Sequence, residues 1–322
     1  MNTVLLFSLA PDSLVLNFLL LVAGVVVVLW GADRLTDGAV GLAERMGISQ
    51  LVIGLTVVAM GTSMPEFCVS LVSAIKGTPD LAVGNVVGSN IFNSMLIVGC
   101  AALVAPMTIL HSTVKKDIPF ALVASVALLM ACMDGVISRI DGILLLLFFG
   151  VFMYFTLHGA KSEENTSADK TPMSPLKAVL LLLLGLFCLI AGSNVFVDNA
   201  TAVAHSLGVS DAVIGLTIVA GGTSLPELAT SIVAARKGNS SIAIGNVLGS
   251  NVFNILLIIG ATGFICPMTI EGITSVDLSM MVISMVLLWL FSFTKYTIER
   301  WEGGVLTVLF VGYMSYLIFG LG

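Results

Sequence analysis

The amino-acid sequence predicts an all-α membrane protein with ten transmembrane helices in two inverted five-helix repeats and broken helices at the midplane. Three observations lead to this prediction. The 322 residues are 58% hydrophobic and only 10% charged, which leaves too few polar side chains to cover a soluble domain. The two halves of the chain repeat one another, and the positive charges gather on one side of the predicted membrane.

Ten apolar stretches have the length that a membrane span requires, about 20 helical residues for a hydrocarbon core of roughly 30 Å. They lie near residues 14–33, 39–74, 79–104, 118–136, 140–159, 176–197, 200–235, 240–264, 276–294 and 302–321. A polar, proline-containing linker at 160–175 separates the first five from the second five. We therefore expect a first repeat at 1–159 and a second repeat at 176–322.

The repeats align at a constant offset of 161 residues. Residues 54–93 match residues 215–254 at 24 of 40 positions. Because each half holds an odd number of spans, the second half must enter the membrane in the opposite orientation. Inverted repeats of this kind are typical of transporters, whose substrate sites lie near the midplane where the repeats meet.

The distribution of positive charge predicts the topology. Of the 13 Lys and Arg residues, eleven fall in the loops after the odd-numbered spans, and only Lys76 and Arg139 fall on the other side. Such an excess marks the cytoplasmic side. We therefore expect a protein of the cytoplasmic (inner) membrane, with both termini outside and the linker in the cytoplasm. No basic patch interleaved with aromatic residues suggests a nucleic-acid partner, and no obligate protein partner is evident.

A proline interrupts the second span of each repeat, in "GTSMPEF" and in "GTSLPEL". Pro65 and Pro226 cannot donate a hydrogen bond to the carbonyl four residues earlier. The sequence predicts a broken helix at each site, with carbonyls freed around Ala59 to Thr62 and around Ala220 to Thr223. Irregular backbone at this depth persists where it lines a cavity or is buried in protein.

Glu66 and Glu227 stand directly after these prolines. A charge at the centre of a membrane helix costs about 2.5–3.5 kcal/mol, and no Lys or Arg in the aligned spans compensates it. A simple structural kink would explain the proline and the glycines but not the glutamates, so these two side chains are expected to hold a cation or protons. The same helical faces carry hydroxyls three and four residues earlier, namely Thr62, Ser63, Thr223 and Ser224.

A second polar stripe follows in "GNVVGSNIFN" and "GNVLGSNVFN". Amides and hydroxyls at i, i+4 and i+8 share one helical face in each copy: Asn85, Ser89 and Asn93, then Asn246, Ser250 and Asn254. All the offered ligands are oxygen atoms, without clustered His. The five cysteines are isolated and are interpreted as small buried apolar residues. This ligand set favours Na⁺, Ca²⁺ or Mg²⁺ over zinc or copper.

With these doubled motifs, the chain resembles the sodium/calcium exchanger family of the cation/calcium exchanger superfamily, most closely its compact prokaryotic members. The resemblance covers nearly the whole chain and implies a cluster of cation sites between the repeats. It implies that Glu66 and Glu227 ligate Ca²⁺ together with the backbone carbonyls of Thr62 and Thr223. For sodium it implies the same glutamates with Ser63, Ser89, Ser224, Ser250 and the carbonyls of Ala59 and Ala220.

The resemblance also places Asn93 and Asn254 beside the central position. Some relatives carry Asp where this chain has Asn254, including potassium-dependent members of the superfamily. The cluster here is then expected to hold two carboxylates rather than three.

The function that the sequence favours is a secondary antiporter that exchanges Na⁺ for Ca²⁺ across the membrane by alternating access. The alternative within the same class is a Ca²⁺/H⁺ exchanger, since two glutamates could carry protons instead. A cation channel could use similar oxygen ligands, although broken helices argue against it. We expect no enzyme activity, because the serine elbow, HExxH and GxGD motifs of intramembrane proteases are missing. We expect no cofactor; Ca²⁺ and Na⁺ are transported ions, and membrane lipid surrounds the protein.

Overall fold

The computed structural model describes residues 13–158, 173–208 and 220–320. In the labels, η marks a π-helical segment. The first half of the chain forms α1 (Leu14–Met46), α2 (Gln50–Ile53), η1 (Gly54–Val58), α3 (Ala59–Thr62), α4 (Met64–Ile75), α5 (Pro79–Ile91), η2 (Phe92–Ile97), α6 (Val98–Val104), β1 (Met107–Thr108), η3 (Thr113–Asp117), α7 (Ile118–Ala131), β2 (Val136–Ile137) and α8 (Arg139–His158).

The second half repeats this order. It forms α9 (Pro175–Ser206), α11 (Ala220–Thr223), α12 (Leu225–Arg236), α13 (Ser240–Val252), η5 (Phe253–Ile259), α14 (Gly260–Ile265), β3 (Met268–Thr269), α15 (Ser275–Ser292), β4 (Thr297–Ile298) and α16 (Arg300–Gly320). Of the expected linker at 160–175, all but the last three residues lie outside the described residues.

Helix α1 is longer than the sequence predicts. It begins after Ser13, whose hydroxyl accepts the N–H of Leu16, and it ends at Gly47, where φ is 64°. Glycine adopts this left-handed conformation without the steric cost that a Cβ imposes. The expected end near residue 33 was wrong because the charges that begin there do not break a helix. Helix α9 likewise continues to Ser206, past the expected end near residue 197.

Seven helices in the described part of the chain are long and apolar enough to cross a membrane. The bent pair Gln50–Thr62 and Met64–Ile75 raises this number to as many as eight. The expected span near 118–136 corresponds to α7, a helix of only 14 residues. The expected span near 200–235 includes residues 209–219, which lie outside the described residues. The protein is therefore helical and membrane-spanning, while the count of ten is not reproduced.

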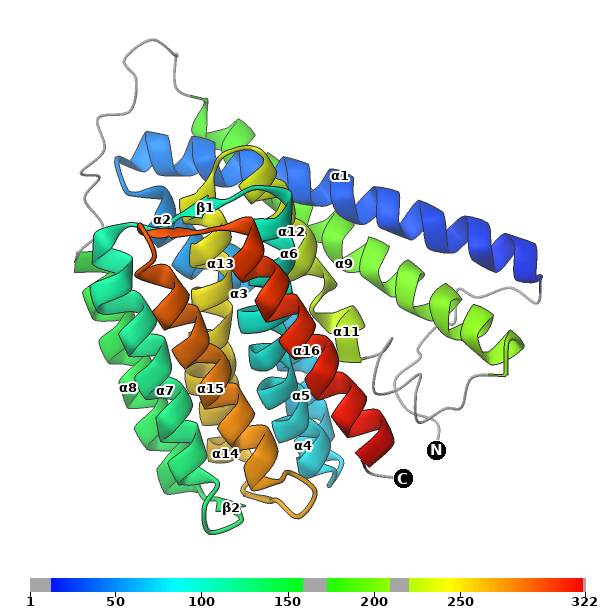
Figure 1. The fold of residues 1–322 in the computed structure, drawn as a ribbon, viewed down its shortest axis with the longest axis vertical. Coiled ribbons are helices and arrows are strands. Elements are labelled where there is room, and N and C mark those ends of the chain that lie inside the picture. Colours follow the sequence, from blue (N-terminus) through cyan, green and yellow to red (C-terminus); the bar gives the residue numbers. More distant parts are fainter. Residues whose placement is uncertain (1–12, 159–172, 209–219, 321–322) are drawn as a thin grey trace.

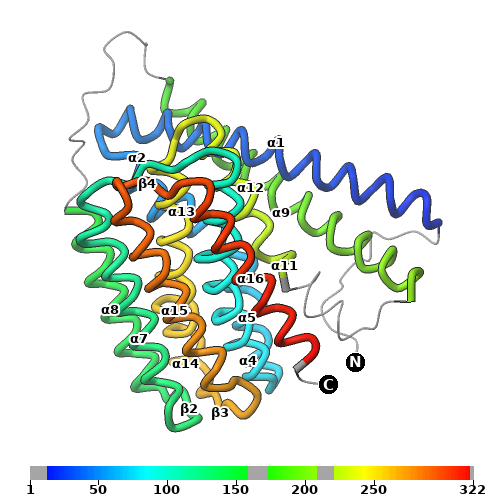
Figure 2. The backbone as a smooth tube through the Cα atoms, in the orientation of Figure 1, coloured from blue at the N-terminus to red at the C-terminus, as the bar shows by residue number. Residues whose placement is uncertain are grey.

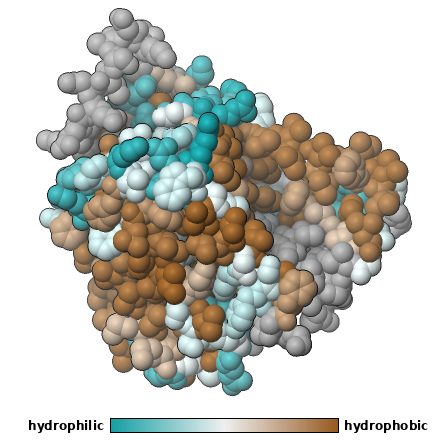
Figure 3. All heavy atoms as spheres, viewed as in Figure 1, coloured by the Kyte–Doolittle hydropathy of each residue, from teal (hydrophilic) through white to brown (hydrophobic). Residues whose placement is uncertain are grey.

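Two of these helices form the centre of the molecule. In the most apolar windows of Pro79–Val104 and Ser240–Ile265, 72% and 94% of the residues are buried, against 22% for α8 and α16. Helices α7, α8, α15 and α16 surround this centre, and α1 and α9 run side by side away from it (Figures 1 and 2). Hydrophobic residues cover the middle of the face in Figure 3, and hydrophilic residues gather along its upper edge. This distribution suits a membrane-embedded body.

Glycines bring α1 and α9 into close contact. A Cβ on Gly185 would lie 2.5 Å from the backbone nitrogen of Leu35 and 2.7 Å from the carbonyl oxygen of Gly31. Gly24 and Gly192 approach each other in the same manner. Small residues at regular helical intervals let two membrane helices approach closely where any larger side chain would collide with backbone.

Four short strands depart from the expected all-α architecture. Strand β1 pairs antiparallel with β4, through Met107 with Ile298, and β2 pairs with β3, through Ile137 with Met268. The two pairs lie at opposite ends of the bundle (Figure 2). Each strand belongs to a loop between helices. Its backbone groups form hydrogen bonds with a strand of the other half, so they need no water as a partner.

Candidate cation site

The predicted helix break occurs in both halves. Residues 50–62 and 64–75 are bent by 47° relative to each other, and Ser63 between them has φ −83° and ψ 5°. Pro65 then stands in the first turn of α4, where the missing N–H has no helical partner to lose. Ser224 has the same conformation, with φ −92° and ψ 6°. The proline therefore starts a new helix rather than kinking an existing one.

The carbonyl of Ala59 is not free, contrary to expectation. It accepts the N–H of Ser63 at 3.0 Å and the hydroxyl of Thr62 at 3.3 Å. The Thr62 hydroxyl also donates to Oδ1 of Asn246, at 3.1 Å. Ala220 and Thr223 are the first and last residues of α11.

Glu66 and Glu227 are each only 1% exposed. The Ser224 hydroxyl donates to Oε1 of Glu66 at 3.0 Å, and the Ser63 hydroxyl donates to Oε1 of Glu227 at 3.0 Å. Each glutamate is thus held by the serine of the other half of the chain. Among the described residues, neither carboxylate forms an ion pair with Lys or Arg.

These crossed bonds differ from the pattern that the sequence predicts. Helical spacing puts Ser63 on the face of Glu66, three residues later. The non-helical backbone at Ser63 interrupts that periodicity, so its hydroxyl reaches the opposite half instead. The two halves therefore form one site jointly.

The predicted polar stripe supports the same region. The hydroxyl oxygens of Ser89 and Ser224 lie 3.2 Å apart, within hydrogen-bonding distance. Asn85 donates to the backbone carbonyl of Glu66 at 3.2 Å, and Asn246 donates to that of Glu227 at 3.3 Å. These two asparagines thus hold the backbone of the glutamates through their carbonyl groups and do not bond to the carboxylates themselves.

Two further asparagines belong to the site and were missed in the sequence. Nδ2 of Asn93 donates to Oδ1 of Asn251 at 3.1 Å, and Nδ2 of Asn254 donates to Oδ1 of Asn90 at 3.3 Å. These bonds again cross between the halves. The signal was available, because Asn90 and Asn251 occupy equivalent positions in "GSN", directly after the serines of the stripe.

Five buried oxygen atoms of these residues have no hydrogen-bond partner in the described part of the protein. They are Oε2 of Glu66, Oε2 of Glu227, Oδ1 of Asn93, Oδ1 of Asn254 and Oγ of Ser250. A buried oxygen without a partner is costly. Carboxylate, amide and hydroxyl oxygens are also the ligands that Na⁺ and Ca²⁺ prefer, so a bound cation would satisfy these atoms.

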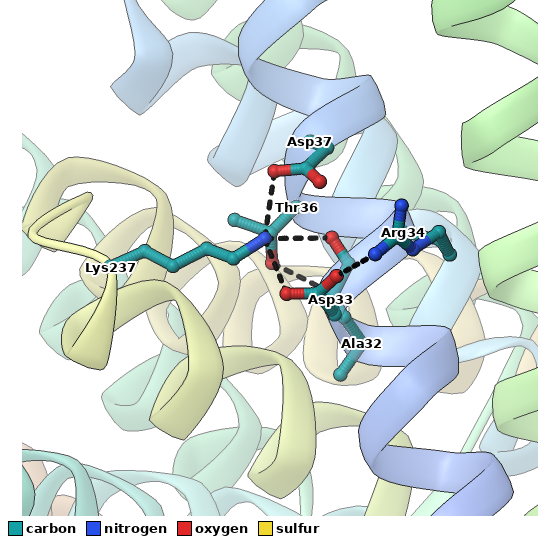
Figure 4. Close-up of polar contacts among 6 residues, drawn as sticks. All are labelled: Ala32, Asp33, Arg34, Thr36, Asp37 and Lys237. Atoms are coloured by element: carbon teal, nitrogen blue, oxygen red, sulfur yellow. Dashed lines mark hydrogen bonds and ion pairs between the residues drawn. The ribbon is translucent and has the colours of Figure 1, made fainter.

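Two aspartates in the middle of α1 form ion pairs with the second half of the chain. Nζ of Lys237, in the loop between α12 and α13, lies 2.6 Å from Oδ1 of Asp33 and 2.7 Å from Oδ1 of Asp37 (Figure 4). Arg34 pairs with Asp33 on its other side. The two carboxylates around Lys237 tie α1 to the loop between α12 and α13.

The model of the family described as sodium/calcium exchanger protein matches this chain twice, over residues 16–158 and 177–319. The chain belongs to the sodium/calcium exchanger family. The two matches together cover most of its length and fall on the two halves that share the crossed hydrogen bonds. The exchanger is accordingly a multi-pass membrane antiporter that transports ions, as the sequence predicted.

Relatives and solved structures agree with this assignment. The sodium/calcium exchanger MaX1 of Methanosarcina acetivorans is 33% identical over 94% of this chain and 99% of its own length. The inner membrane protein YrbG of Escherichia coli is 39% identical over 82% of this chain and 85% of its own. The sodium-calcium exchanger NCX_Mj, soaked with 10 mM Na⁺ and zero Ca²⁺, superposes with a TM-score of 0.84 at 32% identity, over 95% of this chain and all of that one.

Proposed function

We propose that this protein exchanges Na⁺ for Ca²⁺ across the cytoplasmic membrane by alternating access, and that it is not an enzyme. The observation that carries the proposal is a pair of buried carboxylates, Glu66 and Glu227, which form no ion pair with Lys or Arg within residues 13–158, 173–208 and 220–320. Two negative charges in a membrane interior require compensation. One Ca²⁺ neutralises both, and Na⁺ ions can replace it at the same oxygens.

The unpartnered oxygens support part of the ligand assignment, and the resemblance of the doubled motifs to the family implies the rest. We propose that Oε2 of Glu66 and Oε2 of Glu227 bind Ca²⁺, with the Thr62 and Thr223 carbonyls as further ligands. Ser63, Ser89, Ser224 and Ser250 would contribute hydroxyl oxygens to sodium, together with the carbonyls of Ala59 and Ala220. The Ala59 carbonyl already accepts hydrogen bonds from the Ser63 N–H and the Thr62 hydroxyl. These occupy both of its lone pairs, so one of the two bonds would have to be released for Na⁺ to bind there.

We further propose the topology of ten spans in two inverted repeats, with both termini outside and the linker in the cytoplasm. The double match of the family at 16–158 and 177–319 supports two repeats. The eleven-to-two distribution of positive charge supports the orientation. The relative named as an inner membrane protein supports the membrane assigned.

Uptake of ⁴⁵Ca²⁺ into proteoliposomes tests the proposal. Vesicles loaded with Na⁺ are diluted into medium containing choline, at equal pH on both sides and with the membrane potential clamped at zero. We expect rapid uptake that disappears when choline replaces internal Na⁺. Uptake that ignores the Na⁺ gradient but follows an imposed pH gradient would instead identify a Ca²⁺/H⁺ exchanger, in which the two glutamates carry protons.

A further inference from the structure

The side-chain amides of Asn93 and Asn254 can present either of two ends to a cation. An amide oxygen can ligate the ion, whereas an amide NH₂ group can only donate hydrogen bonds and would repel it. The torsion that exchanges the two ends is soft. Something in the structure must therefore select the oxygen end if these residues are to serve a cation site.

Asn90 makes this selection for Asn254. Nδ2 of Asn90 lies 3.9 Å from the sulfur of Met281, on α15. A thioether has no proton to donate, so only the NH₂ end of Asn90 is favoured on that side. The Oδ1 end of Asn90 then faces Asn254 and accepts its Nδ2 at 3.3 Å. This leaves Oδ1 of Asn254 buried and without a hydrogen-bond partner in the part of the chain that the structure describes.

Asn251 contacts Asn93 in the corresponding way, but its own orientation is less strictly fixed, because the Ser94 hydroxyl beside it can donate as well as accept. Its Nδ2 donates to the hydroxyl of Ser94 at 2.8 Å, and its Oδ1 accepts Nδ2 of Asn93 at 3.1 Å. Oδ1 of Asn93 is again buried and without a partner. The same two successive hydrogen bonds thus occur in both halves, which are related by the 161-residue offset. The last acceptor differs, since it is the Met281 sulfur in one case and the Ser94 hydroxyl in the other.

We propose that Asn90 and Asn251 are positioning residues that orient the amides of Asn254 and Asn93 so that their oxygens, and not their NH₂ groups, are available to Ca²⁺. Both are 1% exposed, and each acts across the boundary between the halves. This inference rests on the proposed function. In this interpretation, Asn90 and Asn251 keep the NH₂ groups of Asn254 and Asn93 turned away from the bound cation.

The test compares Asn90→Leu in two backgrounds. In the otherwise native protein, Leu removes the acceptor of the Asn254 amide at similar size, and we expect apparent Ca²⁺ affinity in ⁴⁵Ca²⁺ uptake to fall by about 3- to 10-fold, the range that one lost hydrogen bond gives. In an Asn254→Asp background, both ends of the side chain are oxygens, so orientation no longer matters. There we expect Asn90→Leu to change the affinity by less than about twofold.

A packing role for Asn90 would lower affinity equally in both backgrounds, and that result would overturn the inference. The second pair, Asn251→Leu with Asn93→Asp, repeats the comparison if Asn90→Leu yields too little monodisperse protein on size exclusion. The wild-type protein is assayed in parallel. Absence of wild-type Ca²⁺ uptake would overturn the proposed function, and the inference with it, whereas normal wild-type uptake with equal losses in both backgrounds would overturn the inference alone.

Discussion

Replacing Glu66 by Gln tests the site most directly. The amide keeps the size of the carboxylate and can still accept the Ser224 hydroxyl, which donates to Oε1 at 3.0 Å. The change therefore removes charge while it preserves the packing that insertion and folding require. Of the two buried carboxylates that we assign to Ca²⁺, only Glu227 then remains charged.

The size of the effect follows from burial. Glu66 is 1% exposed, so water cannot replace the lost charge. Removing one partner from a buried charge interaction costs about 3–5 kcal/mol, which corresponds to a loss of Ca²⁺ affinity between about 10²-fold and about 5 × 10³-fold. Glu227→Gln should give a loss of the same size, because its environment repeats that of Glu66.

The measurement is initial ⁴⁵Ca²⁺ uptake into Na⁺-loaded proteoliposomes over a range of Ca²⁺ concentrations, at matched protein content. Glu302→Gln is the matched control, because Glu302 is also fully buried but lies at the start of α16, where its Oε2 accepts the N–H of Glu299 at 2.7 Å. We expect the control to transport at nearly the wild-type rate. Wild-type affinity in Glu66→Gln, or an equal loss in Glu302→Gln, would refute the assignment of the site.

Three further predictions concern potassium, the crossed serines and the glycine contacts. Uptake driven by Na⁺ should persist when choline replaces K⁺ on both sides, because the amide of Asn254 adds no charge to hold another ion; a collapse without K⁺ would show that this residue does not set the dependence. Ser63→Ala should lower the thermal stability of the detergent-solubilised protein, since a hydrogen bond to a carboxylate contributes about 1.5–3 kcal/mol. The loss should shrink in a Glu227→Gln background, and an equal loss there would contradict the crossed bond. Gly185→Ala should lower the free energy of unfolding by about 1–3 kcal/mol, because the added Cβ would collide with α1. Gly150→Ala is the control and should not lower it, since a Cβ there meets nothing within 4 Å. Equal unfolding temperatures for the two variants would refute the close contact.

The sequence predicts which residues form the centre of the site better than it predicts the hydrogen bonds between them. Glu66 and Glu227 were identified because a charge without a partner in an apolar repeat is conspicuous, and both are buried as expected. The partner of Ser63 was not predictable from helical spacing, since the break at that residue redirects its hydroxyl to the other half. Whether these atoms bind cations stays a prediction, for which the transport assay is the measurement.

Boundaries and long-range contacts were the weaker predictions. The charged residues from Asp33 onwards suggested that the first helix ends near residue 33, but charge limits membrane insertion and not helix formation, so α1 continues to Met46. Asn90 falls off the i, i+4, i+8 stripe, and its role emerges only when Asn254 from the other half lies beside it. The repeated "GSN" marks Asn90 and Asn251 as equivalent positions, but it does not show which residue of the other half each of them contacts.

The strand pairs at the two ends of the bundle have a consequence for biosynthesis. Met107 pairs with Ile298, and Ile137 pairs with Met268, so neither end can close until most of the second half has left the ribosome. During that interval Glu66 also lacks the Ser224 hydroxyl that holds it. The first half is therefore synthesised before the partners of its two strands and of Glu66 exist, and completion of the site has to await the second half.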